Sequence, residues 1–199
     1  MRHIYPNKPL ILILFAAVSF ISCAKQAPPE PPFIVITPRG PLSAKVTIYQ
    51  FSDFVCEQCL NAATVMQDLS KEFPDDVKIY FKHLPFTRHS EVVRASKVAL
   101  AAGVQGKFWE MHDSLFENQG SLGEQTYRKL AGDLGLDIEQ FNRDRRNPKL
   151  DKVLDADVSH ARSVKVTGLP TFVINGRVLR AYGSLETFRE IVTSLLNKR

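Results

Sequence analysis

Cysteine and long apolar runs are both scarce in this sequence of 199 residues. It contains three cysteines, too few for a small domain that is held together by disulfides. A hydrophobic content of 44% supplies a core without such crosslinks. The longest apolar run, Leu10 to Ile21, has twelve residues and is too short to cross a bilayer as a helix. These absences predict one domain of ordinary size with its own core.

A large excess of one charge is also missing. The net charge is +5, and removal of an N-terminal segment that holds Arg2 and Lys8 leaves 24 basic against 21 acidic residues, a net charge of +3. The Lys and Arg residues are scattered among Asp and Glu, as on a solvated surface. We therefore expect no nucleic acid partner.

Residues 1–22 have the layout of a signal peptide for export: a short basic start, an apolar run and small residues. The sequence "AKQAPPEPP" follows, with four prolines in nine residues, and predicts a stiff linker over 23–32. Cys23 stands in "FISCA", which resembles a bacterial lipoprotein signal, although Phe20 occupies a position that is usually Leu. A lipidated Cys23 would leave an even pair of cysteines in an oxidising compartment. An ordinary cleaved signal with an incidental thiol is the alternative.

The domain expected at 33–199 begins with a strand, a helix and a second strand. The strand patterns cover 45–51 and 77–81. Between them, apolar residues at helical spacing predict a helix that ends at Pro74: Ala62, Val65, Met66, Leu69 and Phe73. This order favours a right-handed parallel crossover. Cys56 and Cys59 are then expected on the first turn of the helix.

A block of helices is expected at about 88–164, because apolar residues recur at helical steps and strand patterns are weak there. Asp137 and Gln140 form a candidate capping box. The sequence "TFVINGRVLRAYG" then predicts a β-hairpin around Asn175-Gly176. Ser184 is a candidate cap for a last helix with an apolar stripe: Leu185, Phe188, Ile191, Val192, Leu195 and Leu196.

The two cysteines of "FSDFVCEQCL" allow three readings: a structural crosslink, part of a metal site, or a redox pair. A disulfide between Cys56 and Cys59 closes so short a loop that it removes little unfolded-state entropy. A zinc site needs about four ligands, and the sequence has neither a second Cys pair nor histidines at metal-binding spacing. The redox pair is therefore favoured, and no cofactor is expected.

Helix geometry gives that pair its mechanism. The N–H groups of the first turn have no intrahelical partner and the positive end of the helix dipole lies there, so a Cys56 thiolate is favoured. The thiolate is the nucleophile. Cys59, one turn further along on the same side, is placed to attack the mixed disulfide that Cys56 forms with a substrate.

Residues 43–199 resemble the DsbA-like branch of the thioredoxin superfamily. The resemblance lies in "TIYQFSDFVCEQC", "YFKHLPF", the helical block and "GLPTFVING". It implies an α/β thioredoxin fold with an inserted all-helical subdomain, and a cis bond between Leu169 and Pro170. At that bond, the polar groups of Leu169 would hold an extended substrate strand while Pro170 packs over the cysteines.

Three positions depart from the family pattern and are expected to tune the pair. Glu57 and Gln58 replace the Pro or His that relatives often have between the cysteines. A Glu57 carboxylate about 6 Å from the thiolate opposes it by roughly 0.7 to 1.4 kcal/mol, whereas a helix terminus contributes up to about 2 kcal/mol in its favour. Gln50 replaces a buried acid, so a water or Asp53 would have to take the proton of Cys59.

Some conspicuous residues are assigned no function. Asp53 is more simply a turn acid than a base. Trp109, with Phe108 and Phe116, is expected in the core of the helical block. His83 is expected to be a structural histidine with its hydrogen bonds satisfied.

The sequence thus predicts an exported, lipid-anchored thiol-disulfide oxidoreductase that forms disulfides in cysteine-containing proteins. By resemblance, a membrane partner that passes electrons to quinone would reoxidise it. An exported reductase or isomerase would use the same residues, and the departures at Gln50 and Glu57 keep that alternative open. Two further alternatives are a metal-binding module, which would bind metal stoichiometrically at the thiols, and a non-catalytic scaffold of the envelope.

Overall fold

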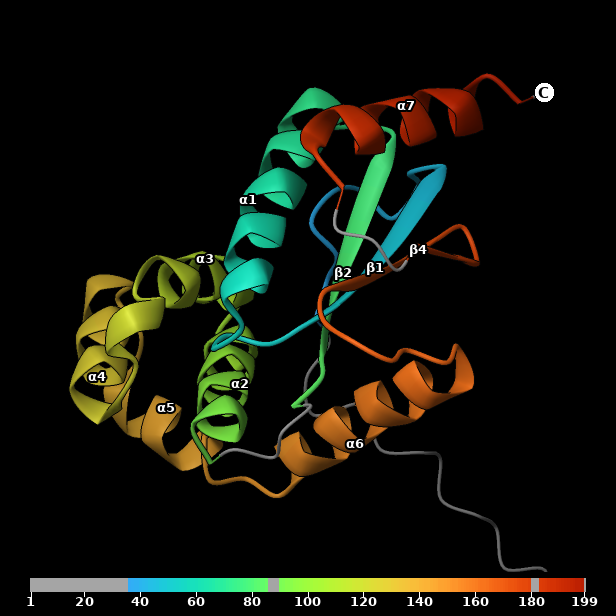
Figure 1. Ribbon diagram of the computed structural model, residues 1–199. Helices are drawn as coiled ribbons and strands as arrows, with labels where there is room; N and C mark the ends of the chain where they lie inside the picture. The colour runs from blue at the N-terminus through green and yellow to red at the C-terminus, as the bar shows by residue number, and fades with distance from the viewer. Residues whose placement is uncertain (1–35, 86–89, 180–182, 199) are drawn as a thin grey trace, which may run out of the picture. The chain divides into compact units, whose positions relative to one another are not determined.

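The computed structural model describes residues 36–85, 90–179 and 183–198. Its centre is a four-stranded sheet in the order β2-β1-β3-β4. Strands β1 (Val46–Ser52) and β2 (Val77–His83) are parallel, and α1 (Glu57–Glu72) connects them. Strand β3 (Thr171–Ile174) runs antiparallel to β1 and forms a hairpin with β4 (Arg177–Leu179) (Figure 1). The predicted crossover and hairpin are both confirmed.

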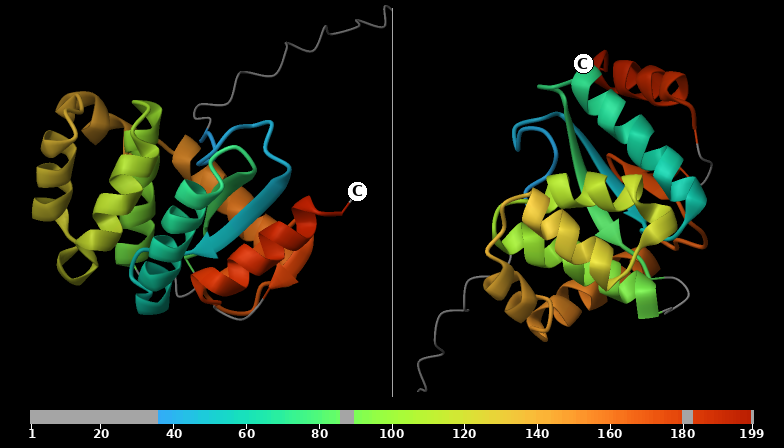
Figure 2. Two further views of the ribbon diagram at one scale, coloured as in Figure 1. Left: turned by 90° about the horizontal axis from the view of Figure 1, so that it is seen from above. Right: turned by 90° about the vertical axis from the view of Figure 1, so that its left-hand side faces the viewer.

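The two faces of the sheet are covered by different helices. Alternate β1 residues Val46 and Ile48 pack in one cluster with residues of α1 and α7 (Leu185–Leu196). Phe51 faces the other side and packs with Ala161 of α6 (Lys149–Ser163). Because side chains alternate along a strand, β1 buries both faces and becomes the centre of the domain (Figure 2).

Four helices form the insertion between β2 and α6. They are α2 (Ser90–Val104), α3 (Phe108–Glu117), α4 (Glu124–Asp133) and α5 (Ile138–Asp144), with the short 3-10 helix η1 (Gln119–Ser121) after α3. The helical block predicted at 88–164 is therefore present, and the predicted thioredoxin fold with a helical insertion is confirmed. The last helix of the block, α6, packs both in the core of the insertion and against the sheet.

Both predicted N-cap residues cap their helices, but the predicted capping box is only half formed, because the backbone N–H of Asp137 donates to the side chain of Gln105 at 2.9 Å and not to that of Gln140. The Asp137 side chain accepts a hydrogen bond from the backbone N–H of Gln140 at 2.8 Å. The Ser184 hydroxyl accepts one from the N–H of Thr187 at 3.3 Å. The capping side chains replace partners that the first N–H groups of a helix lack. The hairpin turn follows its sequence pattern as well, since Asn175 and Gly176 both have positive φ.

Two expectations about buried residues need correction. His83 is fully buried, but neither of its ring nitrogens has a hydrogen-bond partner among the described residues. It lies instead against aromatic rings, with Phe81 at 4.9 Å between centroids, and burial lowers the pKa of its imidazole to about 3. The histidine is structural, yet packing and not hydrogen bonding fixes its ring.

Trp109 lies only partly inside the insertion. Phe108 and Phe116 are buried in the insertion's core as expected, but Trp109 is half-buried and also packs against the cluster of α1 and α7. Its indole N–H donates to the carbonyl of Thr37 at 3.0 Å, and Arg39 lies 4.5 Å from its ring centroid. Trp109 therefore connects the insertion with the segment that precedes β1.

The predicted signal peptide, the predicted linker and Cys23 all lie outside the described residues. The end of the predicted hairpin, at 180–182, lies outside them as well. Within the described part of the chain, no helix is both long and apolar enough to cross a membrane.

The packing of α7 on the sheet predicts a stability difference between two apolar positions. Phe188 is fully buried, and its ring centroid lies 4.8 Å from that of Phe172. Phe188→Ala should lower the free energy of unfolding by about 3 to 5 kcal/mol, measured by urea denaturation. Leu42 is 70% exposed, so Leu42→Ala should change it by no more than about 0.5 kcal/mol. Equal losses would mean that α7 does not cover a packed core.

Candidate active site

The cysteine pair lies where β1 ends and α1 begins. Cys56 is the N-cap residue of α1, with extended backbone angles, and the helix proper starts at Glu57. The expectation that both cysteines lie in the first turn is therefore shifted by one residue: Cys56 precedes the turn and Cys59 lies within it. Cys56 is half-buried and Cys59 is fully buried, and neither forms a disulfide in this structure.

The loop that carries Cys56 is tied down by Asp53. One carboxylate oxygen of Asp53 accepts hydrogen bonds from the backbone N–H groups of Val55 at 2.9 Å and Cys56 at 2.8 Å. This Asx-type turn matches the interpretation of Asp53 as a turn acid. Asp53 is almost fully buried, and burial raises the pKa of its carboxyl.

The two thiols have opposite acidities. The pKa of Cys56 is lowered to about 7, first because the Cys59 thiol hydrogen-bonds to its sulfur, and further because the backbone N–H groups of Cys59 and Gln58 favour its thiolate. The same thiol–thiol hydrogen bond raises the pKa of Cys59, as does the burial of that side chain. Within one helical turn the site therefore holds a thiolate beside a thiol that keeps its proton.

The lowered pKa of Cys56 has a defined consequence for stability. The folded-state pKa of about 7 lies below the ordinary value of 9.0, so the folded, reduced protein is favoured when the thiol is ionised. This contribution is complete above about pH 9 and is lost as the pH falls through about 7. The reduced protein is thus stabilised relative to the unfolded chain mainly on the alkaline side of neutrality.

The carboxylate that opposes the thiolate is that of Asp53. Its charge raises the pKa of Cys56, against the larger lowering by hydrogen bonds. Glu57 and Gln58 are both exposed on the first turn, and of these two residues Gln58 acts on the sulfur through its backbone N–H. The carboxylate of Asp53, which precedes α1 in the chain, therefore opposes the Cys56 thiolate.

Gln50 is buried in β1, between Phe81 of β2 and Phe172 of β3. Its amide nitrogen has no hydrogen-bond partner among the described residues. Ser52, two residues further on the same face of the strand, lies beside Cys59 and lowers the pKa of its thiol. Sequence reasoning did not select Ser52, because a lone serine at the end of a strand carries no motif.

The bond between Leu169 and Pro170 is cis, as the resemblance implies. Pro170 immediately precedes β3, whose first residue Thr171 pairs with Phe51 near the end of β1. The proline is therefore at the same end of the sheet as the cysteines. Pro170 is buried, whereas Leu169 is half-buried and packs against the same core cluster as Cys56.

Another contact to the cysteine loop comes from the insertion. The side-chain amide of Gln119 in η1 donates hydrogen bonds to the carbonyl oxygens of Phe54 at 3.0 Å and Cys56 at 2.9 Å. Sequence reasoning missed this residue. More than 60 positions separate it from its partners, and no local pattern marks a glutamine that reaches so far along the chain.

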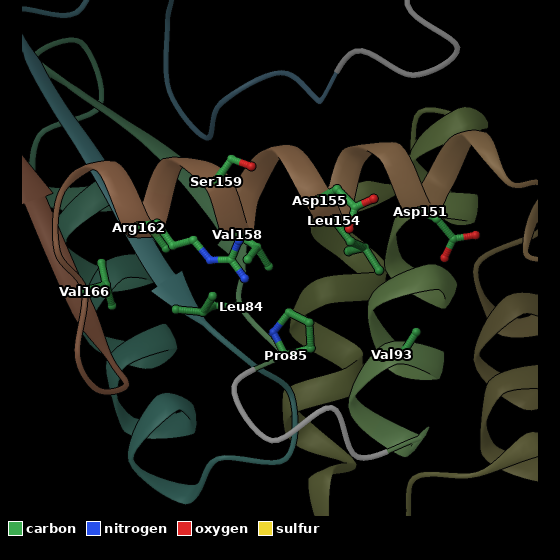
Figure 3. A pocket seen from close by; sticks show the side chains of 11 residues that line it. Leu84, Pro85, Val93, Asp151, Leu154, Asp155, Val158, Ser159, Arg162 and Val166 are labelled. Carbon is green, nitrogen blue, oxygen red and sulfur yellow. The ribbon is translucent and has the colours of Figure 1, made fainter.

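A cavity of about 630 Å³ lies on the other face of the sheet, between α6, α2 and the residues after β2. Figure 3 shows Leu84 and Pro85 opposite Val158 and Arg162 of α6. The backbone N–H of Leu84 donates to the carbonyl of Ser52 at 3.0 Å. The cavity does not contain the thiols, which belong to the α1 side.

Within the described ranges, no group of three or more His, Cys, Asp or Glu side chains is arranged to hold a metal ion.

Solved structures with similar folds include thiol-disulfide exchange proteins. A thioredoxin-like oxidoreductase from Silicibacter pomeroyi DSS-3 has a TM-score of 0.73 at 24% identity, covering 85% of this chain and 95% of that one. The thiol-disulfide exchange protein alpha-DsbA2 from Wolbachia pipientis has a TM-score of 0.73 at 20% identity, covering 80% and 86%. These similarities establish a fold of the DsbA type.

Curated relatives share this segment within much longer sequences. The Na(+)/H(+) antiporter NhaA 1 of Salinispora arenicola is 35% identical over 157 residues, which are 78% of this chain and 24% of that protein. The Na(+)/H(+) antiporter NhaA of Herminiimonas arsenicoxydans is 34% identical over 142 residues, 71% of this chain and 22% of that protein. The chain spans about a quarter of the length of these relatives.

The protein-family model described as Thioredoxin matches residues 36–194, which include both cysteines, the cis proline and the whole sheet. The chain therefore belongs to the thioredoxin family and carries the pair Cys56 and Cys59 within the matched range.

Proposed function

We propose that the protein forms disulfides in exported, cysteine-containing proteins, with Cys56 as nucleophile and Cys59 as resolving thiol. The observation that carries the proposal is the opposite shift of the two pKa values across one helical turn. A low pKa makes Cys56 both a thiolate at neutral pH and a good leaving group. Half-buried Cys56 also remains accessible to a client, whereas buried Cys59 does not.

The exchange moves two electrons from client to protein. A client thiolate attacks Cys56 of the oxidised pair; the bond between Cys56 and Cys59 breaks, and the Cys59 sulfur leaves and takes up a proton. The second client thiolate then attacks the client sulfur of the mixed disulfide and displaces Cys56 as a thiolate. Gln50 cannot deliver the proton to Cys59 because an amide does not titrate; water or Asp53 serves instead.

Leu169 and Pro170 are proposed to position the client. They lie at the end of the sheet that carries the cysteines. The backbone groups of half-buried Leu169 would pair with an extended client segment as an added strand. Val55, which is 41% exposed directly before Cys56, adds apolar surface for such a segment.

Oxidation is the proposed direction because whatever stabilises the thiolate stabilises the reduced protein and makes its disulfide more oxidising. The reductase or isomerase direction is the second candidate. The observation in its favour is the Asp53 charge, which limits how far the pKa of Cys56 falls. A value of about 7 is close to that of thioredoxin and well above that of DsbA.

The place of action is proposed to be the periplasm or cell envelope. The signal pattern at 1–22 supports it, and a similar solved structure is of a periplasmic thioredoxin-like protein from Salmonella enterica serovar Typhimurium. A lipid on Cys23 would anchor the protein to a membrane, where a quinone-linked partner would accept its electrons. The mass of the mature protein tests the anchor: an unmodified N-terminus, or one other than Cys23, excludes it.

Removal of Cys59 should trap the intermediate. In a Cys59→Ala variant, mixed disulfides with client proteins should accumulate through Cys56, because no second thiol can release them. Non-reducing electrophoresis followed by mass spectrometry detects the adducts, and reductant should dissolve them. The matched Cys56→Ala variant, with its buried remaining thiol, should trap few or none. An empty trap in Cys59→Ala would contradict the assigned roles.

The redox equilibrium with glutathione should separate oxidase from reductase. We expect a reduction potential between about −270 mV, that of thioredoxin, and about −120 mV, that of DsbA. Alkylation of the acid-quenched protein, followed by mass analysis, counts free thiols at each glutathione ratio. A potential at or below that of thioredoxin would reject the oxidase proposal and assign the reductase direction.

A further inference from the structure

Gln119 connects the helical insertion with the loop that carries the nucleophile. It is the first residue of η1, directly after α3. Its side-chain nitrogen donates two hydrogen bonds, to the carbonyl of Phe54 at 3.0 Å and to that of Cys56 at 2.9 Å. Both hydrogens of one amide are thus used on the two carbonyls that flank Val55. Neither the exchange reaction nor the proposed client contacts involve Gln119.

The orientation of the Cys56 carbonyl matters for the sulfur. That carbonyl also accepts the N–H groups of Cys59 at 3.0 Å and Leu60 at 3.3 Å, the first hydrogen bonds of α1. The backbone N–H groups of Gln58 and Cys59, in the same turn, lower the pKa of the Cys56 thiol. A rotation of the Cys56 peptide would therefore change how the start of α1 is placed relative to the sulfur, and hydrogen-bond donors act only at short range.

The loop is held from two sides by different groups. The Asp53 carboxylate fixes the N–H groups of Val55 and Cys56, whereas the Gln119 amide fixes the carbonyls. Asp53 does so at a cost to the thiolate, because its charge raises the pKa of Cys56. An amide carries no net charge, so Gln119 secures the loop without that opposition.

Aromatic packing fixes the part of the insertion that carries Gln119. Phe116, three residues before it on α3, packs against Phe54 of the loop with ring centroids 4.9 Å apart. Phe54 is fully buried and also stacks on Phe81 of β2 at 5.1 Å. The ring of Phe54 therefore packs against the insertion, and the carbonyl of Phe54 is hydrogen-bonded to it. Positions supported in this way hold a reactive group in one geometry.

We propose that Gln119 is a positioning residue for thiol-disulfide exchange: its amide holds the carbonyls of Phe54 and Cys56 so that the nucleophilic cysteine stays at the N-terminus of α1. The proposal deepens the proposed function and rests on it for its role in exchange. It also gives the inserted helices a part in the chemistry of the cysteine pair, although they contribute no reacting atom.

The test is the pH dependence of Cys56 alkylation in the full, reduced protein with iodoacetamide. The wild-type rate should rise with a midpoint near pH 7. Gln119→Met keeps the length of the side chain but cannot donate, and should lower the thiolate fraction at pH 6 by about three- to tenfold. Gln119→Glu retains the shape and adds a negative charge, so its loss should be larger. Both variants should shift the glutathione equilibrium toward a more reducing protein.

Gln105 provides the matched control. Its amide donates to the carbonyl of Asp137 at 3.1 Å and accepts from the Asp137 N–H at 2.9 Å, so it too makes two backbone hydrogen bonds, but within the insertion. Gln105→Met should lower the unfolding midpoint in urea and leave the alkylation midpoint and the potential unchanged. If the Gln119 variants likewise lose only stability, Gln119 is a structural residue and the proposal is wrong.

Gln119→Asn keeps the test decisive if Gln119→Met does not fold, because it keeps a neutral amide but is one methylene shorter and so loses its reach to the two carbonyls. Alkylation by a small reagent requires no client, so it reports on Gln119 even in a protein that fails to exchange disulfides with any client. An unchanged midpoint in a folded Gln119 variant refutes the positioning role. An empty Cys59→Ala trap refutes the proposed function instead.

Discussion

The chemistry of this protein depends on a few hydrogen bonds to one sulfur atom. Cys56 caps the N-terminus of α1, where backbone N–H groups have no partners within the helix. The Cys59 thiol, followed by the backbone N–H groups of Cys59 and Gln58, lowers the pKa of Cys56 to about 7. Without them a half-buried thiol would ionise less readily than a free one, because burial disfavours the charged form.

The same hydrogen bond separates the two cysteines into different roles. A proton shared between two sulfurs stabilises the thiolate that accepts it and raises the pKa of the thiol that donates it. Burial of Cys59 acts in the same direction. The pair is therefore asymmetric before any client binds: one sulfur is accessible and ionised near neutral pH, and the other is covered and protonated. Such asymmetry determines which sulfur forms the mixed disulfide.

The loop before α1 is held by one charged side chain and one uncharged side chain. Asp53 fixes two N–H groups of the loop but opposes the thiolate, whereas the uncharged amide of Gln119 fixes two carbonyls. The aromatic contacts around Phe54 attach this loop to both the sheet and the insertion. An inserted helical block is thus part of the support of the active site.

The sequence by itself determined the elements and the reactive pair, because both depend on local patterns. Helical and strand periodicity, the caps at Asp137 and Ser184, and the Asn175-Gly176 turn are set by neighbours a few residues apart. The spacing of Cys56 and Cys59 likewise follows from one helical turn. The resemblance to DsbA-like proteins added the cis bond at Pro170, which no local pattern alone predicts.

The tertiary structure decided what depends on residues that are distant in the chain. Gln119 reaches the cysteine loop across more than 60 positions, and His83 is buried among aromatic rings instead of being hydrogen-bonded. The burial of Asp53 also depends on the packed fold. Desolvation and long-range hydrogen bonds are properties of the assembled core, so a reading of neighbouring residues cannot supply them.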